Sequence, residues 1–310
     1  MAIPVLLDCD PGHDDALAIT LALARPELEV LGITTVAGNA SLDNTTRNAL
    51  RVLALLGRPD VPVAAGAATP LVRELETAPQ VHGVSGLDGA DLPEPRSAAR
   101  PEGAVEFLRA TLAAAPAPVT LIPTGPLTNV ALLLRTYPAI AQRIAAISLM
   151  GGSMGAGNWT AAAEFNIWVD PEAARIVFRS GLPLTMHGLD VTHKALMGLP
   201  EADRLEALGT RVGRVFADLL RFFTRFHVER YGTDQTPIHD AVAVAHVALP
   251  GIVTTVPYHV DVAIDSDITR GRTVVDNRGQ PGMTPNVDVA LDIDRAAFAD
   301  LVVEAVGRYR

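Results

Sequence analysis

Short runs rich in β-branched residues alternate with longer amphipathic runs over the first part of the chain. Residues 3–8 predict a buried strand, and residues 14–26 predict a helix that Pro26 ends. Residues 28–38 and 41–57 repeat the same pair. This order is typical of an α/β fold, so we expect a mainly parallel central β-sheet flanked by helices, with an active site at the carboxyl ends of its strands.

Longer helices replace this alternation from about residue 190, and the longest covers residues 211–232. No linker of low complexity and no fixed repeat divides the chain, so we expect a single domain over residues 1–310. Residues 78–101 are rich in Pro, Gly and Asp and have little apolar periodicity. A loop of this length inside a compact domain is usually functional or mobile.

The composition argues against several classes of function. The chain has 35 acidic and 25 basic residues, which argues against nucleic-acid binding and against a polybasic membrane surface. Its one cysteine, Cys9, permits no intramolecular disulfide and no cysteine-rich zinc site. The first residues lack the basic region of a secretory signal, and no run of about 18 uncharged apolar residues occurs. We therefore expect a cytoplasmic protein.

Four aspartates, Asp8, Asp10, Asp14 and Asp15, lie within eight positions where the first predicted strand ends. A helix N-terminus tolerates Asp14 and Asp15, because its free N–H groups and its dipole favour carboxylates. A strand cap followed by a helix cap is therefore one interpretation. A hard divalent cation is the sharper one, because such cations prefer oxygen ligands and stabilise clustered carboxylates. That cation would need further oxygen ligands from other strand ends.

Polar residues follow other predicted strands or open the next helix: Asn39, Thr124, Glu164, Asn166, His239 and Asp240. Each alone is an ordinary turn or helix-start residue. Because the carboxyl ends of parallel strands meet at one edge of a sheet, their joint occurrence indicates a common site.

Several longer stretches carry a family resemblance: residues 8–16, 35–50, 82–89, 123–129, 150–152, 157–174 and 237–241. In this order and at these separations they resemble the inosine–uridine-type nucleoside hydrolases, over nearly the whole chain. The resemblance implies a Rossmann-like nucleoside hydrolase fold. It also implies Ca²⁺-dependent hydrolysis of the N-glycosidic bond of purine or pyrimidine ribonucleosides, giving ribose and free base in nucleoside salvage.

The resemblance implies a set of metal ligands, namely Asp10, Asp15, Asp240 and the backbone carbonyl of Thr124. The expected reaction uses a metal-activated water and passes through an oxocarbenium-like transition state. Asp10 is the expected base, because a ligand carboxylate beside such a water can take its proton.

The resemblance also assigns residues to the substrate: Asp14, Asn39, Met150, Asn158, Glu164, Asn166 and Asp240 to the sugar, and His82 and His239 to the base. Asn158 is expected near the 5′-hydroxyl. His239 matches the position proposed to protonate the leaving base, which suits a histidine near neutral pH. His82, on a mobile loop, is either a second base-side histidine or a plain loop residue. Trp159, Trp168, Phe226 and Tyr231 are predicted as mostly core, with Trp159 or Tyr231 as candidates to stack on the base.

The base preference stays open, and the family commonly forms homodimers or homotetramers. Two alternatives also stay open at this point. A haloacid-dehalogenase-like phosphohydrolase has a similar Asp-x-Asp loop but needs Thr or Val where this chain has Gly12. A non-catalytic nucleoside-binding protein on the same fold would be expected to lack Asp10 or His239, and both are present.

Overall fold

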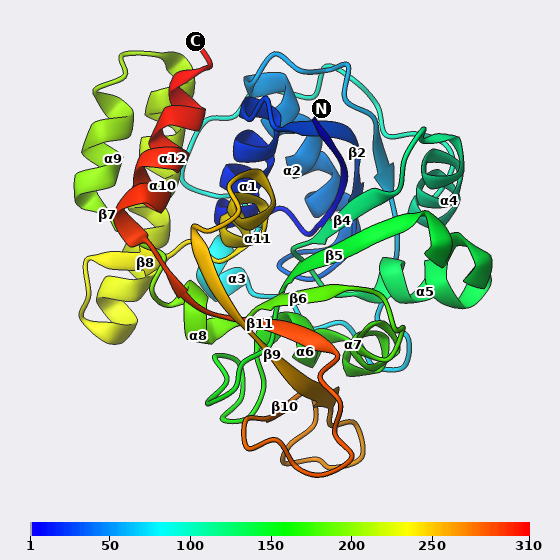
Figure 1. Cartoon of the computed structure of the whole chain (residues 1–310). Coiled ribbons are helices and arrows are strands. Elements are labelled where there is room, and N and C mark those ends of the chain that lie inside the picture. The colour runs from blue at the N-terminus through cyan, green and yellow to red at the C-terminus, as the bar shows by residue number, and fades with distance from the viewer. Residues whose placement is uncertain (1) are drawn as a thin grey trace.

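The computed structural model describes residues 2–310, except for the side chain of Tyr231. The predicted stacking of Tyr231 on the base therefore lies outside the described residues. Nine strands form one sheet in the order β10-β9-β11-β6-β5-β4-β1-β2-β3 (Figure 1). Their bounds are β1 Ile3–Cys9, β2 Leu28–Thr35, β3 Val63–Ala65, β4 Val119–Pro123, β5 Ile144–Met150, β6 Leu184–His187, β9 Val253–Val262, β10 Thr273–Asp276 and β11 Val287–Ile293.

Within the described residues of this sheet, the pairs from β11 through β6, β5, β4, β1 and β2 to β3 are parallel, and only the two pairs made by β9 are antiparallel. The predicted α/β class with a mainly parallel sheet is thereby confirmed. A separate small sheet pairs β7, Leu196–Gly198, with β8, Gln235–Pro237. These strands have three residues each, which is too short for a visible alternation in the sequence.

Helices cover both faces of the large sheet (Figure 1). Their bounds are α1 His13–Ala24, α2 Leu42–Leu55, α3 Pro79–His82, α4 Ala104–Ala114, α5 Thr128–Thr136, η1 Pro138–Arg143, α6 Phe165–Val169, α7 Pro171–Phe178, α8 Leu189–Thr192, α9 Leu199–Glu206, α10 Arg211–Tyr231, α11 Asp240–Ala248 and α12 Arg295–Gly307. One apolar core joins the sheet to α1, α10, α11 and α12. A second core joins its other face to α4, α5 and α7. No helix within residues 2–310 has the length and apolar character that a membrane crossing requires.

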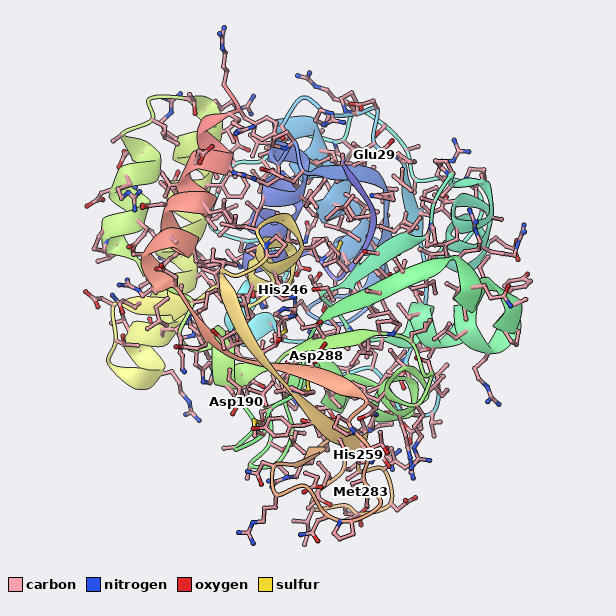
Figure 2. All side chains as sticks on the ribbon, in the orientation of Figure 1. Glu29, Asp190, His246, His259, Met283 and Asp288 are labelled. Atoms are coloured by element: carbon pink, nitrogen blue, oxygen red, sulfur yellow. The ribbon has the colours of Figure 1, made fainter. Side chains whose placement is uncertain are left out.

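The order in which successive strands are added to the sheet reverses between β1 and β4. Strands β1, β2 and β3 follow one another toward one edge of the sheet, and β4, β5 and β6 follow one another toward the other edge. Ligands of open α/β sheets bind at such a switch point, outside the carboxyl ends of the strands. The edge of the sheet at β10 lies far from this switch point, because four other strands separate β10 from β4. The loop after β10 carries the exposed Met283 (Figure 2).

Candidate active site

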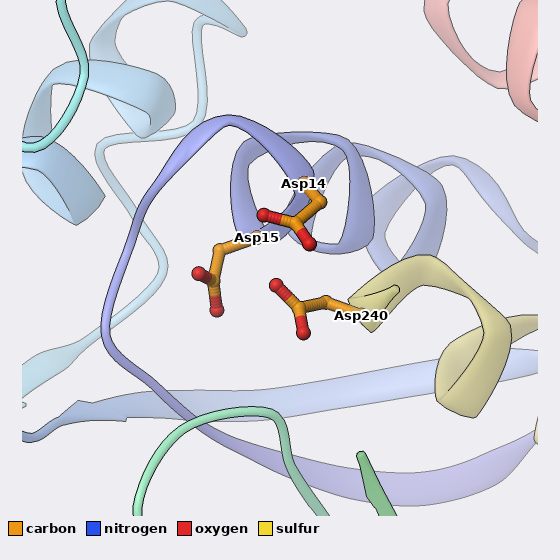
Figure 3. Close-up of side chains that lie close together, drawn as sticks. All are labelled: Asp14, Asp15 and Asp240. Carbon is orange, nitrogen blue, oxygen red and sulfur yellow. The ribbon is translucent and has the colours of Figure 1, made fainter. Parts of the chain in front are cut away.

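Three carboxylates converge at the switch point. Strand β1 ends at Cys9, and the turn of Pro11 and Gly12 leads into α1, so Asp14 and Asp15 lie in its first turn. Asp240 is the first residue of α11. One carboxylate oxygen from each of these three residues lies within 4.8 Å of the others, and Figure 3 shows the groups pointing toward one another.

Burial and mutual repulsion destabilise the ionised form of these carboxyl groups. Burial, and then the charge of Asp15, raises the pKa of Asp14 to about 7. Burial, and then the charge of Asp14, raises the pKa of Asp240 well above its ordinary value. Within residues 2–310 no ion pair connects Asp14, Asp15 or Asp240 to a basic side chain. Three buried acids without a counter-charge form a donor set that could hold a metal ion.

Asp10 lies beside this cluster and is fully buried. Its Oδ2 accepts a hydrogen bond of 2.7 Å from the backbone N–H of Asn39, whereas its Oδ1 has no partner among the described residues. The backbone approaches it so closely that a Cβ at Gly38 would lie 2.1 Å from Oδ2, and one at Gly125 would lie 2.6 Å from Oδ1. Burial, and then the charge of Asp15, raises its pKa well above the ordinary value. Asp10 thus keeps one buried oxygen available for a ligand.

Thr124, directly after β4, reaches the same cluster. Its Oγ1 donates a hydrogen bond of 2.8 Å to Oδ1 of Asp15, and its carbonyl oxygen accepts one of 2.7 Å from Nδ2 of Asn166. The structure therefore places Asp10 and Thr124 next to the converging carboxylates of Asp14, Asp15 and Asp240. Asp8 points elsewhere: its Oδ1 accepts hydrogen bonds from Thr34 and Asn129.

The start of α6 builds the adjacent wall of the site. Glu164 caps this helix, and its carboxylate accepts hydrogen bonds from the backbone N–H groups of Gly152 and Asn166, both at 3.0 Å. Burial raises its pKa to about 7. Nδ2 of Asn166 also lies 3.3 Å from the carbonyl oxygen of Met150 at the end of β5. These bonds fasten the helix start to the ends of β4 and β5.

A cavity of about 890 Å³ opens over these residues, within the range of small-molecule pockets. The predicted site residues that line it are Asp14, Asn39, His82, Thr124, Met150, Asn158, Glu164, Asn166, His239 and Asp240. Asp10 and Asp15, the remaining two, lie buried next to them. The rest of the lining is rich in rings: Trp159, Phe165, His193, Phe223, Phe226 and His227.

Two predicted histidines also line the cavity, and both lie next to the acid residues. His239 directly precedes Asp240, and Nδ1 of His82 lies 3.5 Å from the backbone N of His13, which directly precedes Asp14. Nδ1 of His239 lies 2.8 Å from Oγ1 of Thr192, and burial, followed by the nearby His193, lowers its pKa well below the ordinary value. Nδ1 of His82 lies 3.1 Å from Nδ1 of His13, and burial lowers the pKa of His82 in the same way. Both imidazoles are therefore neutral near pH 7.

The family model described as inosine-uridine preferring nucleoside hydrolase matches residues 5–300. The chain belongs to this family. It is therefore a glycosidase-type hydrolase of ribonucleosides, and the predicted membership is confirmed. The phosphohydrolase and the non-catalytic binding protein are set aside with this result.

Relatives of this nucleoside hydrolase match it end to end. The pyrimidine-specific ribonucleoside hydrolase RihA of Citrobacter koseri is 53% identical over 310 residues, covering 100% of this chain and 99% of that protein. RihA of Escherichia coli O17:K52:H18 is 52% identical, with full coverage of both chains. Among solved structures, the purine-preferring ribonucleoside hydrolase from Gardnerella vaginalis superposes with a TM-score of 0.93, 35% identity and 98% coverage of each chain. An inosine-guanosine nucleoside hydrolase gives a TM-score of 0.89 with 29% identity and full coverage of both chains.

Some cavity residues of this nucleoside hydrolase escaped the sequence analysis. Phe226 was predicted as core but lines the cavity, as do Phe223, His227 and His193. Phe223, Phe226 and His227 lie on α10, where an apolar stripe gives no sign of which part faces a cavity rather than the core. Trp159 lines the cavity, whereas Trp168 is absent from its lining.

Proposed function

We propose that this nucleoside hydrolase, as a single domain of residues 1–310, cleaves pyrimidine ribonucleosides such as uridine to ribose and free base in a Ca²⁺-dependent reaction. One observation carries the reaction type: buried carboxylates converge at a cavity of small-molecule size whose lining also contains histidines. The pyrimidine preference rests on the end-to-end similarity to relatives named as pyrimidine-specific.

The proposed Ca²⁺ ligands are Asp10, Asp15, Asp240 and the carbonyl oxygen of Thr124. The buried Oδ1 of Asp10 lacks a partner, and a set of carboxylate and carbonyl oxygens suits Ca²⁺. When bound, Ca²⁺ would lower the pKa of a water and orient the ribose hydroxyls.

Asp10 is proposed as the base. It accepts a proton from the attacking water while the water oxygen bonds to C1′ and the bond from C1′ to the base nitrogen breaks. Burial raises the pKa of the Asp10 carboxyl, which favours proton uptake. Oδ2 accepts a single hydrogen bond, so its second lone pair could take this proton while Oδ1, which has no partner within residues 2–310, is left for the metal.

The residues proposed to contact the substrate hold the ribose next to Asp10. They are Asp14, Asn39, Met150, Asn158, Glu164, Asn166 and Asp240. Glu164 and Asn166 are themselves fixed by hydrogen bonds to strand ends. Rigid contacts of this kind orient C1′ and favour a flattened, oxocarbenium-like sugar.

His239 is proposed to protonate the leaving base, with His82 as a second base-side group. The imidazolium form of His239 is the proposed proton donor, and it returns to the neutral ring on transfer. Burial lowers its pKa, which makes this form a stronger acid. Its Nδ1–H would donate to Oγ1 of Thr192, which leaves the Nε2 proton for transfer.

A substrate panel tests this proposal. Ribose release should be faster from uridine and cytidine than from inosine and guanosine, with kcat/KM higher by about tenfold or more, since small pocket differences give such ratios. A preference for inosine would contradict the pyrimidine assignment, and inactivity on all four would contradict the reaction.

We also propose a cytoplasmic homodimer or homotetramer. Light scattering coupled to size-exclusion chromatography should give two or four times the chain mass of 32.7 kDa. A monomer at assay concentration would contradict this assembly.

A further inference from the structure

The segment between β3 and α3 contains an unusual double acceptor, Glu76. Its Oε2 accepts hydrogen bonds from Nε1 of Trp159 at 2.9 Å and from Nε1 of Trp168 at 3.1 Å. These are the two tryptophans of the chain. One carboxylate oxygen therefore ties together residues on either side of the Glu164 helix cap.

Arg73 contacts both Trp168 and Glu76. Its guanidinium carbon lies 3.8 Å from the ring centroid of Trp168, and its Nη1 donates a hydrogen bond of 2.8 Å to the carbonyl oxygen of Trp168. Its Nη2 lies 3.5 Å from Oε1 of Glu76. A cation over an indole face and a carboxylate at the indole N–H hold that ring in one orientation.

Trp159 connects Glu76 to the cavity, because it bonds to Glu76 and also lines the cavity. Its ring packs edge-on against Phe165, with centroids 4.8 Å apart, and both residues line the cavity next to Asn158. Trp159 is only partly buried, so packing alone leaves its ring free on one side. The hydrogen bond to Glu76 is then the directional contact that fixes this wall.

The chain that follows Glu76 leads to His82. Ala78 donates a backbone hydrogen bond of 3.1 Å to the carbonyl oxygen of Asn39, and then α3 leads to His82. Glu76 therefore connects the wall that carries Trp159 to the segment that carries His82. None of these three contacts of Glu76 involves the acid cluster.

We propose that Glu76 is a positioning residue for nucleoside binding: it holds Trp159 as a fixed wall of the cavity and anchors the segment that presents His82. It touches no reacting atom. The expected signature is therefore weaker substrate binding with nearly unchanged chemistry. The assay on uridine rests on the proposed function, whereas the fluorescence readout described below does not.

The first experiment compares Glu76→Ala, Glu76→Gln and the control Glu74→Ala. Glu74 is exposed on the same segment and makes no contact of these kinds with the other described residues. Glu76→Ala should raise KM for uridine by roughly five- to tenfold and change kcat by less than about twofold, since it removes a charge-assisted acceptor. Glu76→Gln should stay near wild type, because an amide oxygen also accepts. A KM for Glu76→Ala equal to that of Glu74→Ala would overturn the proposal.

Tryptophan fluorescence reads the contact directly, because both indoles bond to Glu76. Glu76→Ala should shift the emission maximum to longer wavelength as Trp159 gains water contact, while Glu76→Gln and Glu74→Ala should not. An unchanged spectrum in folded Glu76→Ala would overturn the proposal. Inactivity of the wild type on uridine would instead count against the proposed function and leave this readout intact.

A double-mutant cycle with Trp159→Phe separates the wall from a general loss of stability. Phe keeps an aromatic ring but cannot donate to Glu76. The KM penalty of Glu76→Ala should shrink in the Trp159→Phe background. A full penalty in that background, or a matching fall of kcat, would show that Glu76 does not act through Trp159.

Discussion

The cavity lining has two groups of residues that come from different parts of the fold. The acid end, as the carboxylate group is called here, uses residues that directly follow β1 and β4 or begin α1 and α11, all elements of the sheet core. The base end, the group of histidines and other rings, uses mainly α3, α6, α8 and α10, although its His239 directly precedes Asp240 at the start of α11. The proposed metal-binding and sugar-binding groups thus lie at strand ends and helix starts, and most of the proposed base-side groups lie on other helices.

The two ends also differ in how single side chains are held. Asp10 and Glu164 are fixed by backbone N–H groups, which the fold itself places. His239 depends on one hydroxyl, that of Thr192, and His82 depends on contacts with His13. Side chains at the base end are thus held by contacts that a single substitution can remove, whereas the backbone contacts at the acid end persist. This difference suits a family whose members are named for different bases.

The largest expected effect lies at the acid end. Asp10→Asn should lower kcat for uridine by about 10³-fold or more, in the upper range for loss of a general base. Asp8→Asn is the matched control, because Asp8 bonds to Thr34 and Asn129 instead of facing the cluster. Ribose release measures both variants. Turnover of Asp10→Asn within tenfold of the control would remove Asp10 as base.

A smaller effect is expected at the base end. His239→Ala should slow uridine hydrolysis by roughly 10²-fold, the usual value of general acid help. A riboside with a 4-nitrophenolate leaving group should lose much less, because that group departs without protonation. Steady-state kinetics on both substrates decide the point. Equal losses would contradict an acid role for His239.

The smallest effect concerns stability in chelator. The folded pKa of about 7 for Asp14 and for Glu164 exceeds the ordinary values of 3.8 and 4.5. A raised carboxyl pKa gives stability that is present below the ordinary value and is lost as pH rises through the folded value. Because the ordinary values lie near 4, most of this loss falls between about pH 4 and 7. The last part, complete by about pH 8, should lower Tm slightly between pH 7 and 8 in the absence of metal, at roughly 2–4 °C per kcal/mol lost.

The buried histidines do not reverse this sign. The folded pKa of His187 is lowered to about 3 and that of His13 to about 4, so both are neutral in either state above pH 7.5. Calorimetry in chelator measures how steeply Tm falls with pH. The variant Glu164→Gln should make this fall shallower. A Tm that rises from pH 7 to 8 in chelator would contradict the account of uncompensated buried acids.

The sequence predicted the acid end far better than the base end, for a physical reason. A strand, a two-residue turn and a helix start are local structures, so the positions of Asp10, Asp14 and Asp15 follow from their spacing. Thr124 and Asp240 follow because strand ends and helix starts share one edge of the sheet. The parallel sheet itself followed from the alternation of strands and helices.

The residues that were missed depend on long-range packing. Phe223, Phe226 and His227 face the cavity because of how α10 packs against α9 and α12, and no local pattern fixes that rotation. The pairing of Glu76 with two tryptophans more than 80 residues away is equally invisible to local spacing. Trp168 was predicted as core, but its indole N–H donates a hydrogen bond to Glu76.

The central claim is that the acid end holds Ca²⁺ for ribonucleoside hydrolysis. The most direct measurement is uridine hydrolysis by chelator-treated protein as Ca²⁺ is added back, followed by ribose release. We predict negligible turnover without Ca²⁺ and saturable recovery with it. Full turnover in excess chelator, or no recovery on adding Ca²⁺, would contradict the claim.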